Sequence, residues 1–284
     1  MTEKMPPIAL TIAGLDPSGG AGVLADVRAF AALGCFPTAA ITSLTFQNTS
    51  GVVGALHQSG ETVRAQVLPI VEDFAVDCAK TGMLPTREVI SEVARLFREA
   101  ALPAPVVDPV MRATSGDDLI DDNAVGCLVS DLFPLARLVT PNIPEAERLT
   151  GMKISDEGSM RDAASRIREM GARAVLVKGG HLGSRAPNSD SEAEGSTRQA
   201  IDVLNNEGRV IVFRAEMVRG GEIHGSGCTL SAAIAACLGQ GMTLEDAVAK
   251  GKEFVTAAIK GSLAIGHGAR VLFTDSGIGP GRSS

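Results

Sequence analysis

The chain has 284 residues, of which 45% are hydrophobic and 3% aromatic, with no Trp and no Tyr. A formal net charge of −7 argues against nucleic acid or an anionic membrane as the main partner, and the lack of aromatic residues argues against a stacking platform for single strands. No segment approaches the roughly 20 apolar residues of a transmembrane helix, and the first apolar stretch is too short for a signal peptide. We therefore expect a cytoplasmic protein with neither nucleic acid nor membrane as a partner.

The five cysteines show no metal-binding pattern. They stand at positions 35, 78, 127, 228 and 237, and none forms a Cys-x-x-Cys pair. An odd number scattered through apolar segments is typical of reduced thiols in a cytosolic protein.

Short aliphatic runs alternate with amphipathic segments along the chain. Strands are predicted at 8–14, 37–44, 75–83, 104–111, 136–142 and 174–181, and helices at 21–33, 61–74, 85–100, 121–132, 159–170 and 243–263. Residues 198–218 predict a hairpin with its turn at 205–208. The alternation is typical of right-handed βαβ units, so the predicted fold is α/β, with a central, mostly parallel sheet flanked by helices on both faces.

The chain is predicted to form one domain, residues 1–284, with its core at about 8–275. Residues 183–198 are polar and acidic and predict a mobile surface loop, and 276–284 predict a frayed tail. Six motifs fall at the carboxyl ends of predicted strands: GLDPSGG, TFQNT, KTGM, DPVM, TPN and KGGH. Ligands bind at the carboxyl ends of strands in open parallel sheets, so these motifs predict one shared site.

The segment HGSGCTLSAAIAA, residues 224–236, places a glycine-containing turn before a helix. Backbone N–H groups in such a turn and the positive end of the helix dipole favour an anion, although many such turns bind none. The spacing differs from GxxxxGK[ST], which excludes a Walker-type nucleotide site. Cys228 stands where the turn meets the helix, either as a functional thiol or as a small buried residue that begins the helix.

Together these motifs resemble the hydroxymethylpyrimidine/phosphomethylpyrimidine kinases of thiamine biosynthesis, within the ribokinase-like superfamily. The resemblance covers about residues 8–275, in the family's order: AGLDPSGGAGVLADV, TSLTFQNTSGV, KTGML, VVDPVMRATSGD, VTPNIPEAERLTG, VLVKGGHL and HGSGCTLSAAIAA. It implies a ribokinase-like fold, a homodimer, and ATP- and Mg²⁺-dependent phosphorylation of 4-amino-5-hydroxymethyl-2-methylpyrimidine. Phosphorylation of the monophosphate to the diphosphate would follow in the same site.

The resemblance also implies catalytic roles around the glycine-containing turn. Gly225, Ser226 and Gly227 would donate N–H groups to the γ-phosphate. Cys228 would stand against the substrate hydroxyl as the catalytic base, where most ribokinase-like enzymes have Asp. A helix amino terminus can lower the pKa of a thiol towards neutrality, which suits that role.

Metal, ATP and substrate contacts are carried over in the same way. Asp108 and Glu145 would hold Mg²⁺, which needs only one or two carboxylates beside water and phosphate oxygens. Lys178, Asn142 and His224 would contact ATP. The pyrimidine would be bound by Gly14, Asp26, Gln47, Met83 and Val110.

Two other functions stay open on the sequence. Pyridoxal also carries a hydroxymethyl group on a flat heteroaromatic ring, so a pyridoxal kinase of the same superfamily is one alternative. The other is a non-catalytic pyrimidine-binding protein, against which the intact HGSGC, Asp108 and Glu145 argue. Phe46 and Arg112 depart from the family's pattern, and we expect Phe46 to narrow the pocket beside Gln47.

Overall fold

The computed structural model describes residues 5–112, 116, 119–120, 122–180, 199–218 and 223–273, so the predicted loop at 183–198 and tail at 276–284 lie outside the described residues. The strands of the main sheet are β1 (Ile8–Leu15), β2 (Phe36–Asn48), β3 (Gly51–His57), β4 (Cys78–Thr81), β5 (Val106–Val107), β6 (Leu138–Val139), β7 (Ala174–Gly179), β8 (Gln199–Asn206) and β9 (Arg209–Glu216). A separate ladder pairs β10 (Ile223–His224) with β11 (Arg270–Val271).

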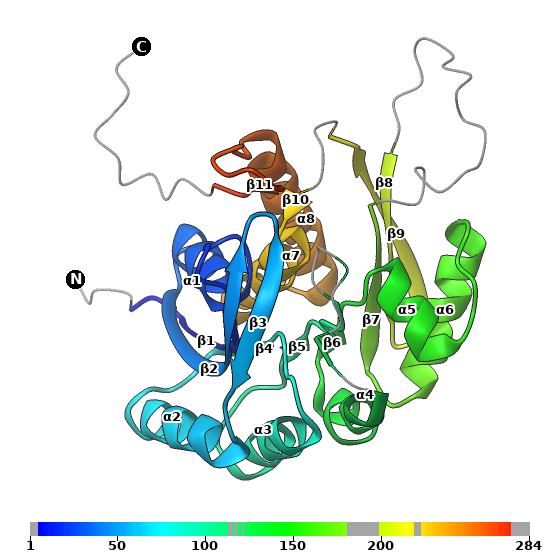
Figure 1. Cartoon of the computed structure of the whole chain (residues 1–284). Coiled ribbons are helices and arrows are strands. Elements are labelled where there is room, and N and C mark those ends of the chain that lie inside the picture. Colours follow the sequence, from blue (N-terminus) through cyan, green and yellow to red (C-terminus); the bar gives the residue numbers. More distant parts are fainter. Residues whose placement is uncertain are drawn as a thin grey trace.

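The main sheet has the strand order β3-β2-β1-β4-β5-β6-β7-β8-β9 (Figure 1). Neighbours from β2 to β7 are parallel, whereas β3, β8 and β9 pair antiparallel. The predicted α/β fold with a mostly parallel sheet is therefore confirmed. The hairpin of β8 and β9 is also confirmed, and its turn residues Glu207 and Gly208 both have positive φ, as a tight hairpin turn requires.

The helices are α1 (Gly22–Ala32), α2 (Gly60–Asp73), α3 (Arg87–Glu99), α4 (Asp122–Cys127), α5 (Ile143–Thr150), α6 (Glu157–Glu169), α7 (Ser226–Gly239) and α8 (Leu244–Lys260). A π-helical turn (Leu128–Leu132) and a 3₁₀ turn (Phe133–Leu135) continue α4. Side-chain caps mark where several helices begin, with Ser59 at α2, Thr86 at α3 and Thr243 at α8. Among the described residues no helix is long and apolar enough to cross a membrane.

Helices cover both faces of the sheet, as predicted. Helices α1, α7 and α8 pack together on one face, and α2 to α6 lie on the other (Figure 1). The central strand β1 contributes to both hydrophobic clusters, with Leu10 and Ile12 in one and Ala9 in the other. A strand buried on both faces needs apolar residues almost throughout, which explains the sequence IALTIAGL.

Strands β3, β10 and β11 and helix α5 were not predicted, and one strand is longer than predicted. Strand β3 carries two glycines on an edge of the sheet, and α5 has only eight residues, so neither has a strong hydrophobic period. Strand β2 continues to Asn48, which places Gln47 inside a strand instead of in a loop after it.

Candidate active site

The loops at the carboxyl ends of the parallel strands meet the amino terminus of α7. Gly225 is the N-cap of α7 with a φ of +79°. A Cβ there would lie 1.9 Å from the carbonyl oxygen of Gly20, and a Cβ on Gly20 would lie 2.1 Å from the His224 ring. Both positions therefore require glycine, and the 16–21 loop is in direct backbone contact with the 224–227 turn.

Lys178 brings a cation to this turn from β7. Its Nζ donates to Asp108 Oδ1 at 2.8 Å and lies 3.0 Å from where a Cβ on Gly227 would stand. Burial alone would lower the pKa of Lys178, but the carboxylates of Asp108 and Glu145 raise it above its ordinary value. The ammonium group therefore stays charged beside the first turn of α7, where a Walker loop would have its own lysine.

Asp108 and Glu145 are buried carboxyl groups that influence each other's ionisation. Burial raises the pKa of Glu145 to about 7, opposed by Lys178 and reinforced by Asp108. Burial would also raise the pKa of Asp108, but the ammonium groups of Lys178 and Lys80 hold it below its ordinary value. Burial and the neighbouring Asp108 make the anion of Glu145 unfavourable, and a hard divalent cation held by both carboxylates would offset this cost.

Asn142 and Glu145 also form the capping box that begins α5. Asn142 Oδ1 accepts from the Glu145 backbone N–H at 2.9 Å, and Glu145 Oε2 accepts from the Asn142 N–H at 2.8 Å. Within the described parts of the chain, no three His, Cys, Asp or Glu side chains gather as metal ligands. Mg²⁺ needs only one or two carboxylates, so Asp108 and the second oxygen of Glu145 fit it, with waters and phosphates as further ligands.

Cys228 lies in the first turn of α7 and is half-buried. Burial raises the pKa of its thiol to about 12; Lys80 opposes this rise, whereas Asp108 and Asp26 add to it. The predicted lowering of the thiol pKa is therefore wrong, because burial and two carboxylates outweigh the helix terminus.

A buried ion pair that sequence reasoning missed lies behind Cys228. Lys80 Nζ donates to both oxygens of Asp26, at 2.9 and 2.8 Å, and Thr11 Oγ1 donates to Asp26 at 2.6 Å. Both charged side chains are fully buried. Asp26 therefore has no exposed atom for the predicted contact with the pyrimidine. The signal for Lys80 was its place in a strand that otherwise reads as buried, where a lysine needs a partner.

Other predicted pyrimidine contacts gather at the ends of β1, β2, β4 and β5. A Cβ on Gly14 would lie 3.0 Å from Met83 Sδ, so these two residues touch. Gln47 and Val110 are half-buried. Phe46 is 53% exposed and its ring lies against Gly54 of β3, so the expected narrowing of the pocket beside Gln47 is not seen.

His224, predicted to contact ATP, is buried between two loops. Its Nε2 lies 2.8 Å from Asp16 Oδ2 and 2.8 Å from Gln47 Nε2. Asp16, which sequence reasoning missed, also accepts from the Ser18 N–H at 2.9 Å and the Ala21 N–H at 2.9 Å. A carboxylate closing the turn of GLDPSGG is the signal that could have found it.

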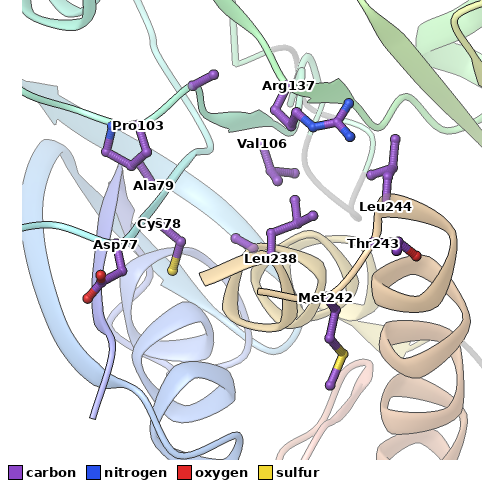
Figure 2. Close-up of a pocket in the computed structure, with 12 residues that line it drawn as sticks. Asp77, Cys78, Ala79, Pro103, Val106, Arg137, Leu238, Met242, Thr243 and Leu244 are labelled. Carbon is purple, nitrogen blue, oxygen red and sulfur yellow. The ribbon is translucent and has the colours of Figure 1, made fainter. Parts of the chain in front are cut away.

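A surface depression of about 320 Å³ lies at the other ends of the strands (Figure 2). It is lined by the amino ends of β4 and β5, by residues that precede β4, β5 and β6, and by the segment from the carboxyl end of α7 to the start of α8, among them Asp77, Cys78, Arg137 and Leu238. None of the predicted site residues lines it, so it is separate from the candidate active site.

Known relatives share this sequence over nearly its whole length. Hydroxymethylpyrimidine/phosphomethylpyrimidine kinase from Rhizobium meliloti is 43% identical over 267 residues, which are 93% of this chain and 95% of the relative. The bifunctional thiamine biosynthesis protein ThiED from Geobacter sulfurreducens is 44% identical over 259 residues, which are 91% of this chain and 50% of that longer protein.

Solved structures are similar as well. Pyridoxal kinase from Bacillus subtilis, in an ADP complex, superposes with a TM-score of 0.81 at 34% identity, covering 94% of this chain and 96% of that one. Phosphomethylpyrimidine kinase from Clostridium difficile superposes with a TM-score of 0.74 at 36% identity, covering 89% and 99%. The ribokinase-like fold is thus shown. The family model described as phosphomethylpyrimidine kinase matches residues 16–272, and the chain belongs to this family of kinases.

Proposed function

We propose that this protein transfers the γ-phosphoryl group of ATP to the hydroxymethyl group of 4-amino-5-hydroxymethyl-2-methylpyrimidine. The observation that carries the proposal is the meeting of three charge-handling groups. The N–H groups at the start of α7, the Lys178 ammonium and the carboxylates of Asp108 and Glu145 converge at one edge of the sheet. Phosphoryl transfer requires mainly positioning and neutralisation of charge on the transferred oxygens, which these groups supply.

Each group has a task in that reaction. Gly225, Ser226 and Gly227 donate backbone N–H groups to the γ-phosphate, and Lys178 neutralises charge beside them. Asp108 and Glu145 would hold Mg²⁺, which supplies Lewis-acid neutralisation of the phosphate oxygens. Asn142 fixes the Glu145 backbone through the capping box. His224 holds the 224–227 turn in place through its hydrogen bond with Asp16.

Cys228 faces the substrate hydroxyl and takes its proton as the bond to phosphorus forms. The thiol is protonated at neutral pH in the protein alone, so it must first release its own proton to solvent, which requires a change in its surroundings on binding. Neutralisation of Asp108 by a bound cation would remove one cause of the raised pKa. Lys80, which favours the thiolate, stays in place.

An assay of ATP consumption tests the substrate. The aminopyrimidine alcohol, its monophosphate and pyridoxal are offered separately, and we expect turnover of the first two. Pyridoxal is the relevant competitor because pyridoxal kinases from Bacillus subtilis and Staphylococcus aureus superpose with TM-scores of 0.81 and 0.82. Turnover of pyridoxal alone would refute the proposal, and binding of pyrimidine without turnover would favour a binding protein.

The assembly and location are proposed on more general grounds. Phe46, Val53 and Leu56 expose 53%, 85% and 56% of their surfaces on the β2–β3 hairpin. An exposed apolar patch of this kind supports a homodimer through this edge. Light scattering after size exclusion should give twice the chain mass of 29.2 kDa, and Val53→Lys with Leu56→Lys should halve it.

We also propose that the protein is cytoplasmic, as its free cysteines suggest.

A further inference from the structure

One imidazole nitrogen joins three segments around the proposed pyrimidine site. His224 Nε2 is 2.8 Å from Asp16 Oδ2 and 2.8 Å from the Gln47 amide. At the other end of that amide, Thr45 Oγ1 is 3.2 Å from Gln47 Oε1 and 2.9 Å from the Leu15 carbonyl oxygen. Asp16, Thr45 and His224 are buried and Gln47 is half-buried, so Gln47 is the member of the chain that reaches the surface.

The partners of this nitrogen decide where its proton lies. An ionised carboxylate only accepts hydrogen bonds, so the contact with Asp16 requires a proton on His224 Nε2. A protonated Nε2 cannot accept from an amide NH₂ group, so it requires the oxygen of the Gln47 amide on its side. A half-turn of the amide exchanges oxygen and nitrogen without moving the rest of the side chain.

Thr45 leads independently to the same orientation. Its hydroxyl has one proton, and the Leu15 carbonyl can only accept it. With this proton on the shorter contact to Leu15, at 2.9 Å against 3.2 Å to the amide, the Thr45 oxygen is left as an acceptor, which favours the NH₂ group of Gln47 on that side. The contacts at both ends of the amide therefore give the same orientation, with the oxygen towards His224 and the NH₂ group towards Thr45. This orientation is fixed by His224 and Thr45, which are buried away from a ligand.

We propose that Asp16 and His224 are positioning residues that set the hydrogen-bond polarity of Gln47 and thereby select an aminopyrimidine. The inference rests on the proposed function. In the fixed orientation Gln47 offers a ligand an oxygen acceptor beside a free N–H. A ring nitrogen next to an exocyclic amino group presents the complementary acceptor and donor, whereas the pyridoxal ring carries no amino group. Because His224 directly precedes Gly225, the same contact ties substrate recognition to the phosphate-binding turn.

A double-mutant cycle tests the link by calorimetric titration of the aminopyrimidine alcohol without ATP. We expect His224→Leu and Gln47→Ala each to weaken binding by about tenfold or more, because each leaves buried polar partners unpaired. The double variant should bind no more weakly than the weaker single variant. Losses that multiply instead would mean that the two residues act independently and would overturn the proposal.

Two more variants keep the test decisive. His224→Gln can place an amide NH₂ group where Nε2 stood and should restore most of the affinity, which a purely structural role of the ring would not predict. Asp16→Asn permits the opposite polarity and should lower the preference for the aminopyrimidine over pyridoxal by about tenfold. Asp16→Asn also tests the proposal if His224→Leu does not fold. An unchanged preference for the aminopyrimidine over pyridoxal in this variant would contradict the proposal. A wild-type protein that binds no aminopyrimidine would refute the proposed function itself.

Discussion

The ammonium group of Lys178 lies so close to the α-carbon of Gly227 that any side chain at position 227 would press against it. A Cβ on Gly227 would lie 3.0 Å from Lys178 Nζ, while that Nζ is held at 2.8 Å by Asp108. The turn before α7 therefore receives its cation from a strand that lies about fifty residues earlier in the sequence. In the proposed function, this ammonium group takes the part that a lysine of the turn itself plays in a Walker loop.

Substitution of Gly227 should therefore impair catalysis more than stability. We expect Gly227→Ala to displace the Lys178 ammonium by a fraction of an ångström and to lower kcat/KM for ATP by about 10- to 100-fold, because misplacement of this size is costly in positioned reactions. Steady-state kinetics and thermal unfolding measure the two effects. Gly126→Ala, on an open surface of α4, is the matched control and should leave the kinetics unchanged while raising stability slightly, because alanine favours a helix more than glycine does. Equal kinetics for the two variants would contradict the role of Lys178.

Replacement of Cys228 should slow the chemical step. We expect Cys228→Ala to lower kcat by about 10²- to 10⁴-fold, the usual contribution of a general base, with little change in the affinity for pyrimidine. Cys228→Ser should not restore the rate, because a hydroxyl is a weaker acid than a thiol. Single-turnover kinetics isolate the step. A loss below about tenfold in both variants would leave Cys228 as a packing residue.

The buried pair of Lys80 and Asp26 should matter strongly for stability. Lys80→Met leaves a fully buried carboxylate without its cation, and we expect the free energy of unfolding to fall by about 3–5 kcal/mol. Urea denaturation measures it. Lys80→Met combined with Asp26→Leu should recover most of the loss, because an apolar pair carries no unpaired charge. Lys250→Met, which removes an exposed ion pair with Glu253, is the control and should have little effect.

Asp16 should make stability depend on pH in the acid range. Burial alone would raise the pKa of Asp16, but hydrogen bonds from His224 and Ser18 lower it below 3.8. A carboxyl group whose pKa is lower in the folded state stabilises the protein fully above its unfolded pKa and loses this contribution as the pH falls through the folded pKa. The stability difference between wild type and Asp16→Asn should therefore be constant above about pH 5 and shrink below about pH 3.8. A difference that does not change down to pH 2 would contradict the assignment.

Much of the fold was accessible from the sequence because β1 and β7 are largely aliphatic runs. Strands buried on both faces read clearly, and the polar motifs that follow them mark one edge of the sheet. Strand β3 was missed because an exposed edge strand with two glycines has no hydrophobic period. Strands β5 and β6 have only two residues each, so few residues pair in the middle of the sheet. The hydrophobic pattern of the sequence does not reveal strands this short.

The site was accessible in part, since residue types predict chemistry but not burial. Lys178 and Asp108 were expected near the phosphate turn, and in the structure Lys178 Nζ lies 2.8 Å from Asp108 Oδ1. Asp26 was expected at the substrate but is fully buried against Lys80, which comes from a strand more than fifty residues away. The pKa of Cys228 could not be predicted either, because it depends on carboxylates that only the folded chain brings near.

The backbone contact between Gly20 and Gly225 has a consequence for motion. A side chain at either position would clash, so the 16–21 loop and the 224–227 turn pack against each other without space between them. The 2.8 Å hydrogen bond between His224 and Asp16 joins the same two segments. Their amide protons should accordingly exchange with deuterium through a common opening event, and a ligand that slows exchange in one loop should slow it equally in the other.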